Sequence, residues 1–159
     1  MESSMEAGGG APAGPAGPAV GPRTRVDVVW EGGRRYRGGR PDGPTLLVDG
    51  ERQQAPGPVD TMMIALASCS AIDVVDILEK RRTPAASLRV EVEFDRAATT
   101  PRRVLAARLR WIVATASDRA HVERAADLSI RKYCSVAASL APDVRLSWEV
   151  EVRQPGGEP

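Results

Sequence analysis

The sequence predicts an α+β domain with a mostly antiparallel sheet and one long central helix. Short alternating segments typical of strands come in groups, at 24–50 and 87–115, and a long apolar helical segment at 60–82 separates the groups. Strict alternation of strands and helices, which is the pattern of a parallel sheet, does not run through the chain. A further helical stretch and one last strand follow, which fits an antiparallel sheet packed against helices.

The two ends of the chain differ in composition from the middle. Residues 1–23 are mostly Ala, Gly and Pro with almost no large apolar side chains, so they bury too little surface to offset the entropy of ordering. Residues 154–159 have the same character. We therefore expect a disordered tail at 1–23, one folded domain at 24–153 and a flexible C-terminus at 154–159.

Three short strands are expected before the long helix. The segment TRVDVVW at 24–30 alternates and is rich in β-branched residues, which favours a strand. Gly32 and Gly33 form a hairpin turn signal, and RRYR at 34–37 is the expected returning strand. TLLVDG at 45–50 is the third, followed by a loop.

The segment DTMMIALASCSAIDVVDILEKRR at 60–82 predicts a long helix. Pro58 suits a first-turn position, Asp60 places negative charge near the positive end of the helix dipole, and Pro84 ends the helix. The apolar residues occupy more than one stripe, which predicts burial on most sides up to Ile72. One small sheet cannot supply that cover, so we infer an intertwined homodimer.

The second half of the chain predicts three strands and two helices. Alternation at 87–95 indicates a strand with one wet face, and alternation at 102–115 favours a strand over the helix that Ala and Leu also permit. Residues 117–133 have a Ser/Asp N-cap and helical spacing, and 134–142 form a short second helix. The strand at 144–152 ends the domain.

Composition and charge limit the kinds of binding partner and cofactor that we expect. The net charge of +1 gives no electrostatic basis for binding nucleic acid or a membrane surface. No apolar run is expected to be long enough to span a bilayer, so we expect a cytoplasmic protein. The single histidine, His121, offers no cluster of metal ligands, and we expect neither a metal nor an organic cofactor.

The two cysteines, Cys69 and Cys134, leave two interpretations open. Cysteine is among the most buried residue types and usually packs as a small hydrophobe. Alternatively, the two thiols form a redox pair. Cys134 lies at the expected start of a helix with Arg131 and Lys132 just before it, and these features favour a thiolate.

Cys69 lies in mid-helix between small residues that leave room for a molecule to approach the sulfur. Its thiolate needs a cation from elsewhere in the fold. Asp60 precedes it by nine residues, which is ~13 Å along the helix axis and about half a turn out of phase. Asp60 is therefore better placed to serve the thiol of a partner chain. The candidate cations are on the second strand: Arg34, Arg35 and Arg37.

Three segments together resemble the OsmC/Ohr family, the osmotically inducible and organic hydroperoxide resistance proteins, and within it the redox-protein-like branch. They are VVWEGGRRYRGG, GPVDTMMIALASCSAIDVVDILEKRR and IRKYCSVAASLAPDVRLSWEVEV. The family hallmark is a Gly-Pro, an acidic residue, an apolar helix and a small-residue pair before a Cys. A second Cys follows near a Tyr-Cys-Ser-Val element.

The resemblance implies an intertwined α+β dimer with thiol-dependent peroxidase activity on organic or inorganic hydroperoxides. It implies that Cys69 is the peroxidatic cysteine and Cys134 the resolving one, with a dithiol reductant restoring both. Asp60 falls where the family usually carries a Glu that holds an Arg against the reactive thiol, and Arg35 is the best match for that Arg. No metal or bound organic cofactor is implied.

A second function class remains open. A non-catalytic dimeric, stress-associated protein of this fold would bind an apolar ligand in its central cleft, lined by Met62, Met63 and Ile64.

Overall fold

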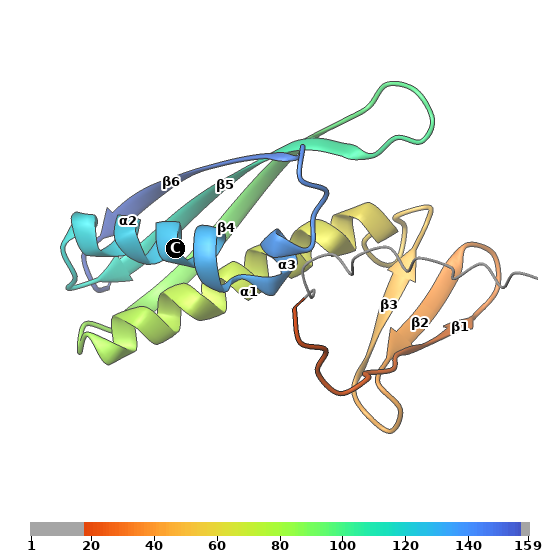
Figure 1. Cartoon of the computed structure of the whole chain (residues 1–159), viewed down its shortest axis with the longest axis horizontal. Helices are drawn as coiled ribbons and strands as arrows, with labels where there is room; N and C mark the ends of the chain where they lie inside the picture. Colours follow the sequence, from red (N-terminus) through yellow and green to blue (C-terminus); the bar gives the residue numbers. More distant parts are fainter. Residues whose placement is uncertain (1–17, 157–159) are drawn as a thin grey trace, which may run out of the picture.

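The computed structural model describes residues 18–156, and Figure 1 shows the order of its elements. Residues 18–26 are exposed and form no helix or strand. The rest of the predicted tail, and residues 157–159 of the predicted C-terminal one, lie outside the described residues. The elements are β1 (Asp27–Trp30), β2 (Arg35–Gly39), β3 (Thr45–Asp49), α1 (Pro58–Lys80), β4 (Ala85–Arg96), β5 (Val104–Thr115), α2 (Arg119–Leu128), the π-helix η1 (Ser129–Tyr133), α3 (Ser135–Ala138) and β6 (Arg145–Arg153).

The strands form two three-stranded sheets, with orders β1-β2-β3 and β4-β5-β6. The first sheet is antiparallel throughout, and β4 pairs with β5 antiparallel. β6 lies parallel to β5, from Ala106 opposite Arg145 to Ala114 opposite Arg153. The prediction of a mostly antiparallel fold therefore holds with one exception. The helices between β5 and β6 cause it, since they carry the chain back so that β6 runs in the direction of β5.

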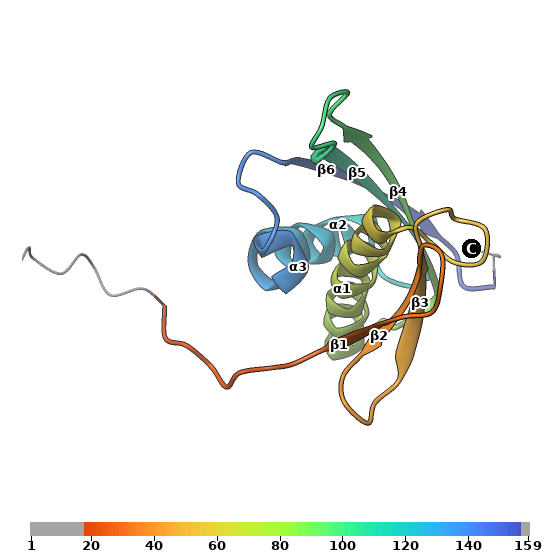
Figure 2. The same cartoon turned by 90° about the vertical axis from the view of Figure 1, so that its right-hand side faces the viewer.

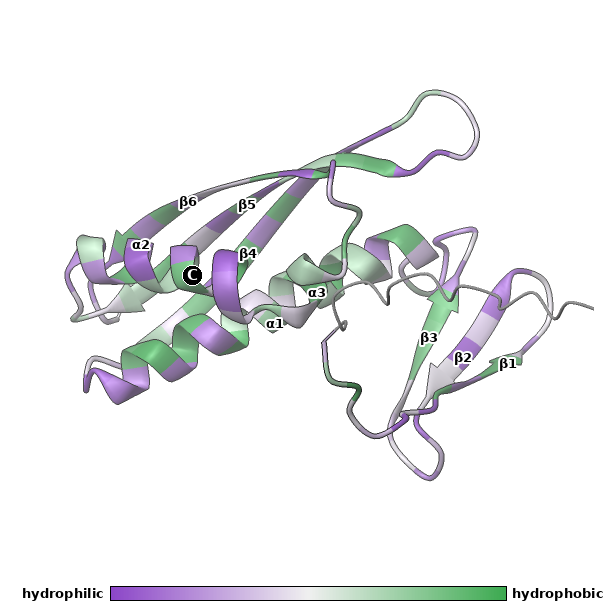
Figure 3. Ribbon diagram, viewed as in Figure 1, coloured by the Kyte–Doolittle hydropathy of each residue, from purple (hydrophilic) through white to green (hydrophobic). Residues whose placement is uncertain are grey.

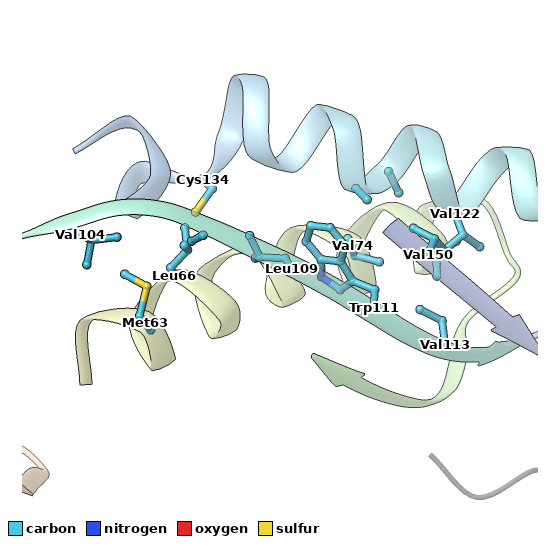
Figure 4. Close-up of a cluster of buried hydrophobic side chains, with 14 residues drawn as sticks. Met63, Leu66, Val74, Val104, Leu109, Trp111, Val113, Val122, Cys134 and Val150 are labelled. Carbon is cyan, nitrogen blue, oxygen red and sulfur yellow. The ribbon is translucent and has the colours of Figure 1, made fainter. Parts of the chain in front are cut away.

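The C-terminal sheet carries the hydrophobic core. α1 and α2 lie on one face of it (Figure 1, Figure 2). The side chains of Leu66, Leu109, Trp111, Val113 and Val122 are fully buried between these layers, and Figure 4 shows them together with Cys134. The alternation of β5 predicted its strand, and the sheet buries the apolar side of that alternation.

α1 buries one stripe of side chains within its own chain. Met63, Leu66, Ser70, Val74 and Leu78 are buried, and their spacing of three and four residues places them on one helix face. Three apolar residues on the other faces are exposed: Met62 by 37%, Ile64 by 53% and Ile72 by 62%. One chain therefore does not bury α1 on most sides up to Ile72, and the predicted cover by a second copy stays a prediction.

The prediction that no segment could span a bilayer is also wrong by length and composition. α1 has 23 residues and is apolar enough to cross a membrane on those two measures. Core helices of soluble proteins meet the same measures. In this fold the buried stripe of α1 packs against the C-terminal sheet and α2.

The N-terminal sheet lies beyond the N-terminal end of α1, away from the other layers (Figure 1, Figure 2). β1 and β3 are nevertheless apolar and appear green in Figure 3. Five large side chains of this sheet are 42% to 65% exposed: Val28, Val29, Trp30, Tyr36 and Leu46. A single chain therefore leaves apolar surface open both on this sheet and on α1.

Candidate functional site

The two cysteines meet between α1 and the segment that precedes α3. Cys69 is half-buried in the middle of α1, and Cys134 is 2% exposed. Both are free thiols, and Cys69 lies near enough to Cys134 to raise the pKa of that thiol. In Figure 4 the sulfur of Cys134 points toward α1 beside Leu66. The two predicted cysteines therefore lie near each other.

The π-helix η1 and α3 together fix the place of Cys134. The backbone N–H of Cys134 donates to the carbonyl oxygen of Ser129 at 2.8 Å, which is the wide turn of a π-helix. The residue then serves as the N-cap of α3, where its Sγ accepts from the backbone N–H of Ala137 at 3.4 Å. The predicted position at the start of a helix is confirmed.

The expected thiolate at Cys134 is wrong in direction. The pKa of its thiol is raised to about 11, mainly by burial and also by the nearby Cys69, while the backbone N–H groups of Ala137 and Val136 lower it. The two cations that precede it in sequence are engaged elsewhere. Arg131 pairs with Asp127 at 2.6 Å, and Lys132 lies 5.3 Å from the centre of the Tyr133 ring. Desolvation therefore outweighs the helix N-terminus at this thiol.

A buried polar contact joins η1 to the turn of α1 that carries Cys69. The hydroxyl of Ser129 donates to the carboxylate Oδ2 of Asp73 at 2.7 Å and to the carbonyl oxygen of Ser70 at 3.2 Å. Ser129 and Ser70 are fully buried, and Asp73 is half-buried. Sequence reasoning missed Ser129, because a serine inside a helical pattern gives no local sign of a partner on another element.

Asp60 does hold an arginine, and that arginine is Arg52. The Asp60 carboxylate accepts from the Nε of Arg52 and from the backbone N–H of Gly57, the latter at 3.0 Å. The Arg52 guanidinium, with the Gly57 N–H, holds the pKa of Asp60 below its usual range. Sequence reasoning missed Arg52, although it stands eight residues before Asp60 in the loop that leads into α1.

The loop that presents Arg52 is organised by Asp49, the last residue of β3. The Asp49 carboxylate accepts the backbone N–H groups of Glu51, Gln53 and Gln54 at 2.9, 3.1 and 3.0 Å. These hydrogen bonds hold the pKa of Asp49 below its usual range. Arg52 itself has a φ of 56°, in the left-handed region.

The arginines proposed from the sequence lie on or beside β2, at the far end of α1 from its C-terminus. Arg37 pairs with Glu31 at 2.6 Å. Within the described part of a single chain, Arg34, Arg35 and Arg37 form no hydrogen bond to Cys69. None of these three arginines therefore serves Cys69 through a hydrogen bond within the described part of one chain.

An apolar groove of about 250 Å³ runs between the first half of α1 and β4. Met63 and Ile64, two of the three residues expected to line a cleft, line it, and Met62 does not. Asp60 lies at one end. The other lining residues are Ala67, Val90, Val92 and Phe94. Among residues 18–156, no cluster of three or more His, Cys, Asp or Glu side chains could hold a metal ion.

Residues 50–149 match the family model described as OsmC-like protein. The chain belongs to the OsmC-like family. It is also similar to protein YhfA of Escherichia coli K12, with 38% identity over 128 residues that cover 79% of this chain and 95% of YhfA. Residues 50–149, which the family model matches, include both cysteines, Asp60 and Arg52.

Solved structures of the OsmC-like family share the fold. The OsmC-like protein of Mycoplasma pneumoniae superposes with a TM-score of 0.71 at 13% identity, covering 82% of this chain and 96% of that one. An organic hydroperoxide resistance protein OsmC from Legionella pneumophila superposes with a TM-score of 0.62 at 17% identity, covering 82% and 97%. At these identities the likeness shows the fold alone.

Proposed function

We propose that this chain is a thiol-dependent peroxidase that reduces organic or inorganic hydroperoxides. The observation that carries the proposal is that the two free thiols, Cys69 and Cys134, lie near each other. The half-buried sulfur is the better candidate for attack on a peroxide, since the other is almost sealed from solvent. The OsmC-like family includes proteins named for organic hydroperoxide resistance.

The chemistry would use three steps. The Cys69 thiolate attacks one peroxide oxygen, the O–O bond breaks, and the alkoxide or hydroxide leaves and takes up a proton, so that Cys69 becomes a sulfenic acid. The Cys134 thiol attacks that sulfur, the S–O bond breaks, and water leaves as the disulfide forms. A dithiol reductant then exchanges with the disulfide, restores both thiols and is itself oxidised.

The proposal includes a homodimer. A second copy would cover the open apolar residues of α1 and of the N-terminal sheet, and it would bring a cation to Cys69. Arg35 is the candidate from the family resemblance. Arg52 is the alternative, because it already pairs with Asp60 at the start of α1. Thiols that must be reduced after each turnover fit the reducing cytoplasm.

One equivalent of tert-butyl hydroperoxide tests the peroxidase proposal. We expect the wild-type mass to fall by two hydrogens, and Cys134→Ser to accumulate a Cys69 sulfenic acid that dimedone traps. Cys69→Ser should show neither change. If Cys69 stays a thiol under excess peroxide in the folded dimer, the peroxidase proposal is wrong.

The groove beside α1 favours a second candidate, a protein that binds an apolar ligand. Its volume of about 250 Å³ suits a small apolar molecule, and Met63, Val92 and Phe94 give it apolar walls. A neutral fluorescent probe such as N-phenylnaphthylamine tests this role. Ile64→Arg should abolish probe binding, whereas Val20→Arg, at a 97% exposed position outside the groove, should not. The ligand-binding function replaces the peroxidase proposal if the probe binds and Cys69 does not react with peroxide.

A further inference from the structure

Ser129 forms hydrogen bonds beside both cysteines. Its hydroxyl donates to Asp73 at 2.7 Å and to the carbonyl oxygen of Ser70 at 3.2 Å, both on the turn of α1 that follows Cys69. Its own carbonyl oxygen accepts the backbone N–H of Cys134 at 2.8 Å. One fully buried residue therefore connects the backbone that carries Cys69 to the backbone that carries Cys134.

The spacing of these residues makes the connection rigid. Cys69 and Asp73 are four residues apart on a helix, so they lie on the same face. Cys134 follows Ser129 by one π-turn, and a hydrogen bond closes that turn. A disulfide requires the two Cα atoms to lie about 4.4–6.8 Å apart with suitable Cβ directions. The position of η1 along α1 therefore decides whether the two thiols can reach bonding geometry.

Stability alone does not account for a polar contact here. A hydroxyl and a carboxylate at a helix–helix contact lose hydration, and well-packed apolar side chains often stabilise such a contact as well or better. Buried polar pairs can instead fix one register between two elements, because a shifted register leaves the donor and the acceptor unsatisfied.

We propose that Ser129, held by Asp73, is the positioning residue for disulfide formation between Cys69 and Cys134. This inference rests on the proposed peroxidase function for its biological use, since the positioned step is the attack of the Cys134 thiol on the Cys69 sulfenic acid. In that step the S–S bond forms, the S–O bond breaks, and the oxygen leaves as water with the thiol proton. Ser129 touches neither sulfur and acts through the backbone.

A glutathione redox buffer tests the inference without any peroxide. The folded dithiol reacts with oxidised glutathione to give the Cys69–Cys134 disulfide and two reduced glutathiones, and the equilibrium gives the effective concentration of one thiol at the other. We expect Ser129→Ala and Asp73→Ala each to lower this effective concentration about tenfold, because each removes the hydrogen bond of 2.7 Å that joins η1 to Asp73 of α1. Asp73→Asn should stay close to wild type, since the amide oxygen still accepts from Ser129.

Ser68→Ala is the matched control. Its hydroxyl bonds only to carbonyls of its own helix, at 2.9 Å to Ile64 and 3.3 Å to Ala65, so we expect an unchanged effective concentration. If Ser129→Ala does not fold, the comparison of Asp73→Ala with Asp73→Asn still decides, because Asp73 is only half-buried. A wild-type effective concentration in Asp73→Ala overturns the inference.

The two proposals fail in distinguishable ways. If peroxide leaves Cys69 reduced but glutathione forms a disulfide that Ser129→Ala or Asp73→Ala weakens, the peroxidase proposal is wrong and the positioning role stands. If peroxide oxidises the pair and these variants resolve the sulfenic acid at the wild-type rate, the positioning role is wrong and the peroxidase stands. In both cases urea unfolding of each reduced variant separates a loss of positioning from a loss of folding.

Discussion

The two sheets of this protein have similar apolar strands and opposite surroundings. Trp111 on β5 is fully buried under α1 and α2, whereas Trp30 on β1 is 64% exposed. Val113 is fully buried, and Val29 is 62% exposed. The C-terminal sheet is therefore stabilised by its own chain. The N-terminal sheet keeps apolar residues that residues 18–156 of its own chain do not cover, which is typical of a surface that meets a partner.

The largest expected difference between the two sheets is in stability. Trp111→Ala should lower the free energy of unfolding by about 3–5 kcal/mol, because it opens a cavity in the core. Trp30→Ala removes a side chain that is open in the single chain, so its effect should depend on protein concentration. Urea unfolding at several concentrations checks both. Equal, concentration-independent losses would remove the distinction between the sheets.

Because Cys134 is buried in the core of the C-terminal half, we expect its thiol to react slowly with alkylating reagents. With a pKa of about 11, this thiol at pH 8 should react with iodoacetamide about a hundredfold more slowly than an ordinary cysteine, since only the thiolate reacts. Peptide mass spectrometry of the reduced protein, with the same chain in urea as control, measures the rate. Equal rates in the folded and unfolded chain would contradict the burial.

The same raised pKa predicts the direction of a pH effect on stability. The folded pKa lies above the unfolded one, so the contribution of the neutral thiol is complete below the unfolded pKa and is lost as pH rises toward about 11. Wild type should therefore lose stability between about pH 9 and pH 11 relative to Cys134→Ala. If the difference in the free energy of unfolding between the two proteins stays constant across this range, the prediction is wrong.

The open apolar residues predict where a second copy would bind. Burying one isoleucine or tryptophan gains about 1.5–3 kcal/mol, so Ile72→Asp and Trp30→Asp should each weaken the homodimer at least about tenfold. Sedimentation equilibrium measures the dissociation constant. Arg108→Gln, on an exposed site of β5, is the control. A wild-type dissociation constant in both Asp variants would show that these residues do not form the interface.

Local patterns predicted the elements well and the contacts between them less well. The alternation at 102–115 predicted β5, and the long apolar segment with Pro58 and Pro84 predicted α1 to within a few residues. The direction of β6 was not predicted, because strand direction depends on which neighbour it pairs with and not on its own alternation. The helices before it, which bring the chain back, were the available signal.

At the candidate site, too, the sequence predicted single residues better than the contacts between them. The two cysteines were found because their residue type carries the chemistry. Ser129 and Arg52 were missed because their importance lies in partners on other segments, Asp73 and Asp60, that no local spacing indicates. The expected thiolate at Cys134 failed for a related reason. Helix position can be read from the sequence, but the burial that raises the pKa depends on tertiary packing.

The smallest expected effect concerns the ion pair between Arg52, in the loop after β3, and Asp60, in the first turn of α1. Arg52 is 55% exposed and Asp60 28%, so Arg52→Ala should lower the free energy of unfolding by less than about 1 kcal/mol at neutral pH. The pair lowers the pKa of Asp60, so its contribution is present above the ordinary carboxylate pKa and is lost as pH falls through the lowered value. The difference between wild type and Arg52→Ala should therefore vanish in acid.

Arg52→Gly separates the ion pair from the backbone. Both variants lose the guanidinium, but glycine adopts the left-handed φ of 56° without the cost that alanine keeps. Urea unfolding should therefore rank Arg52→Gly above Arg52→Ala at every pH, by about 1 kcal/mol at most. If Arg52→Ala instead lost several kcal/mol, the N-terminal sheet would be held mainly by this pair in its own chain. The contrast between a self-supported sheet and a partner-supported one would then have to be abandoned.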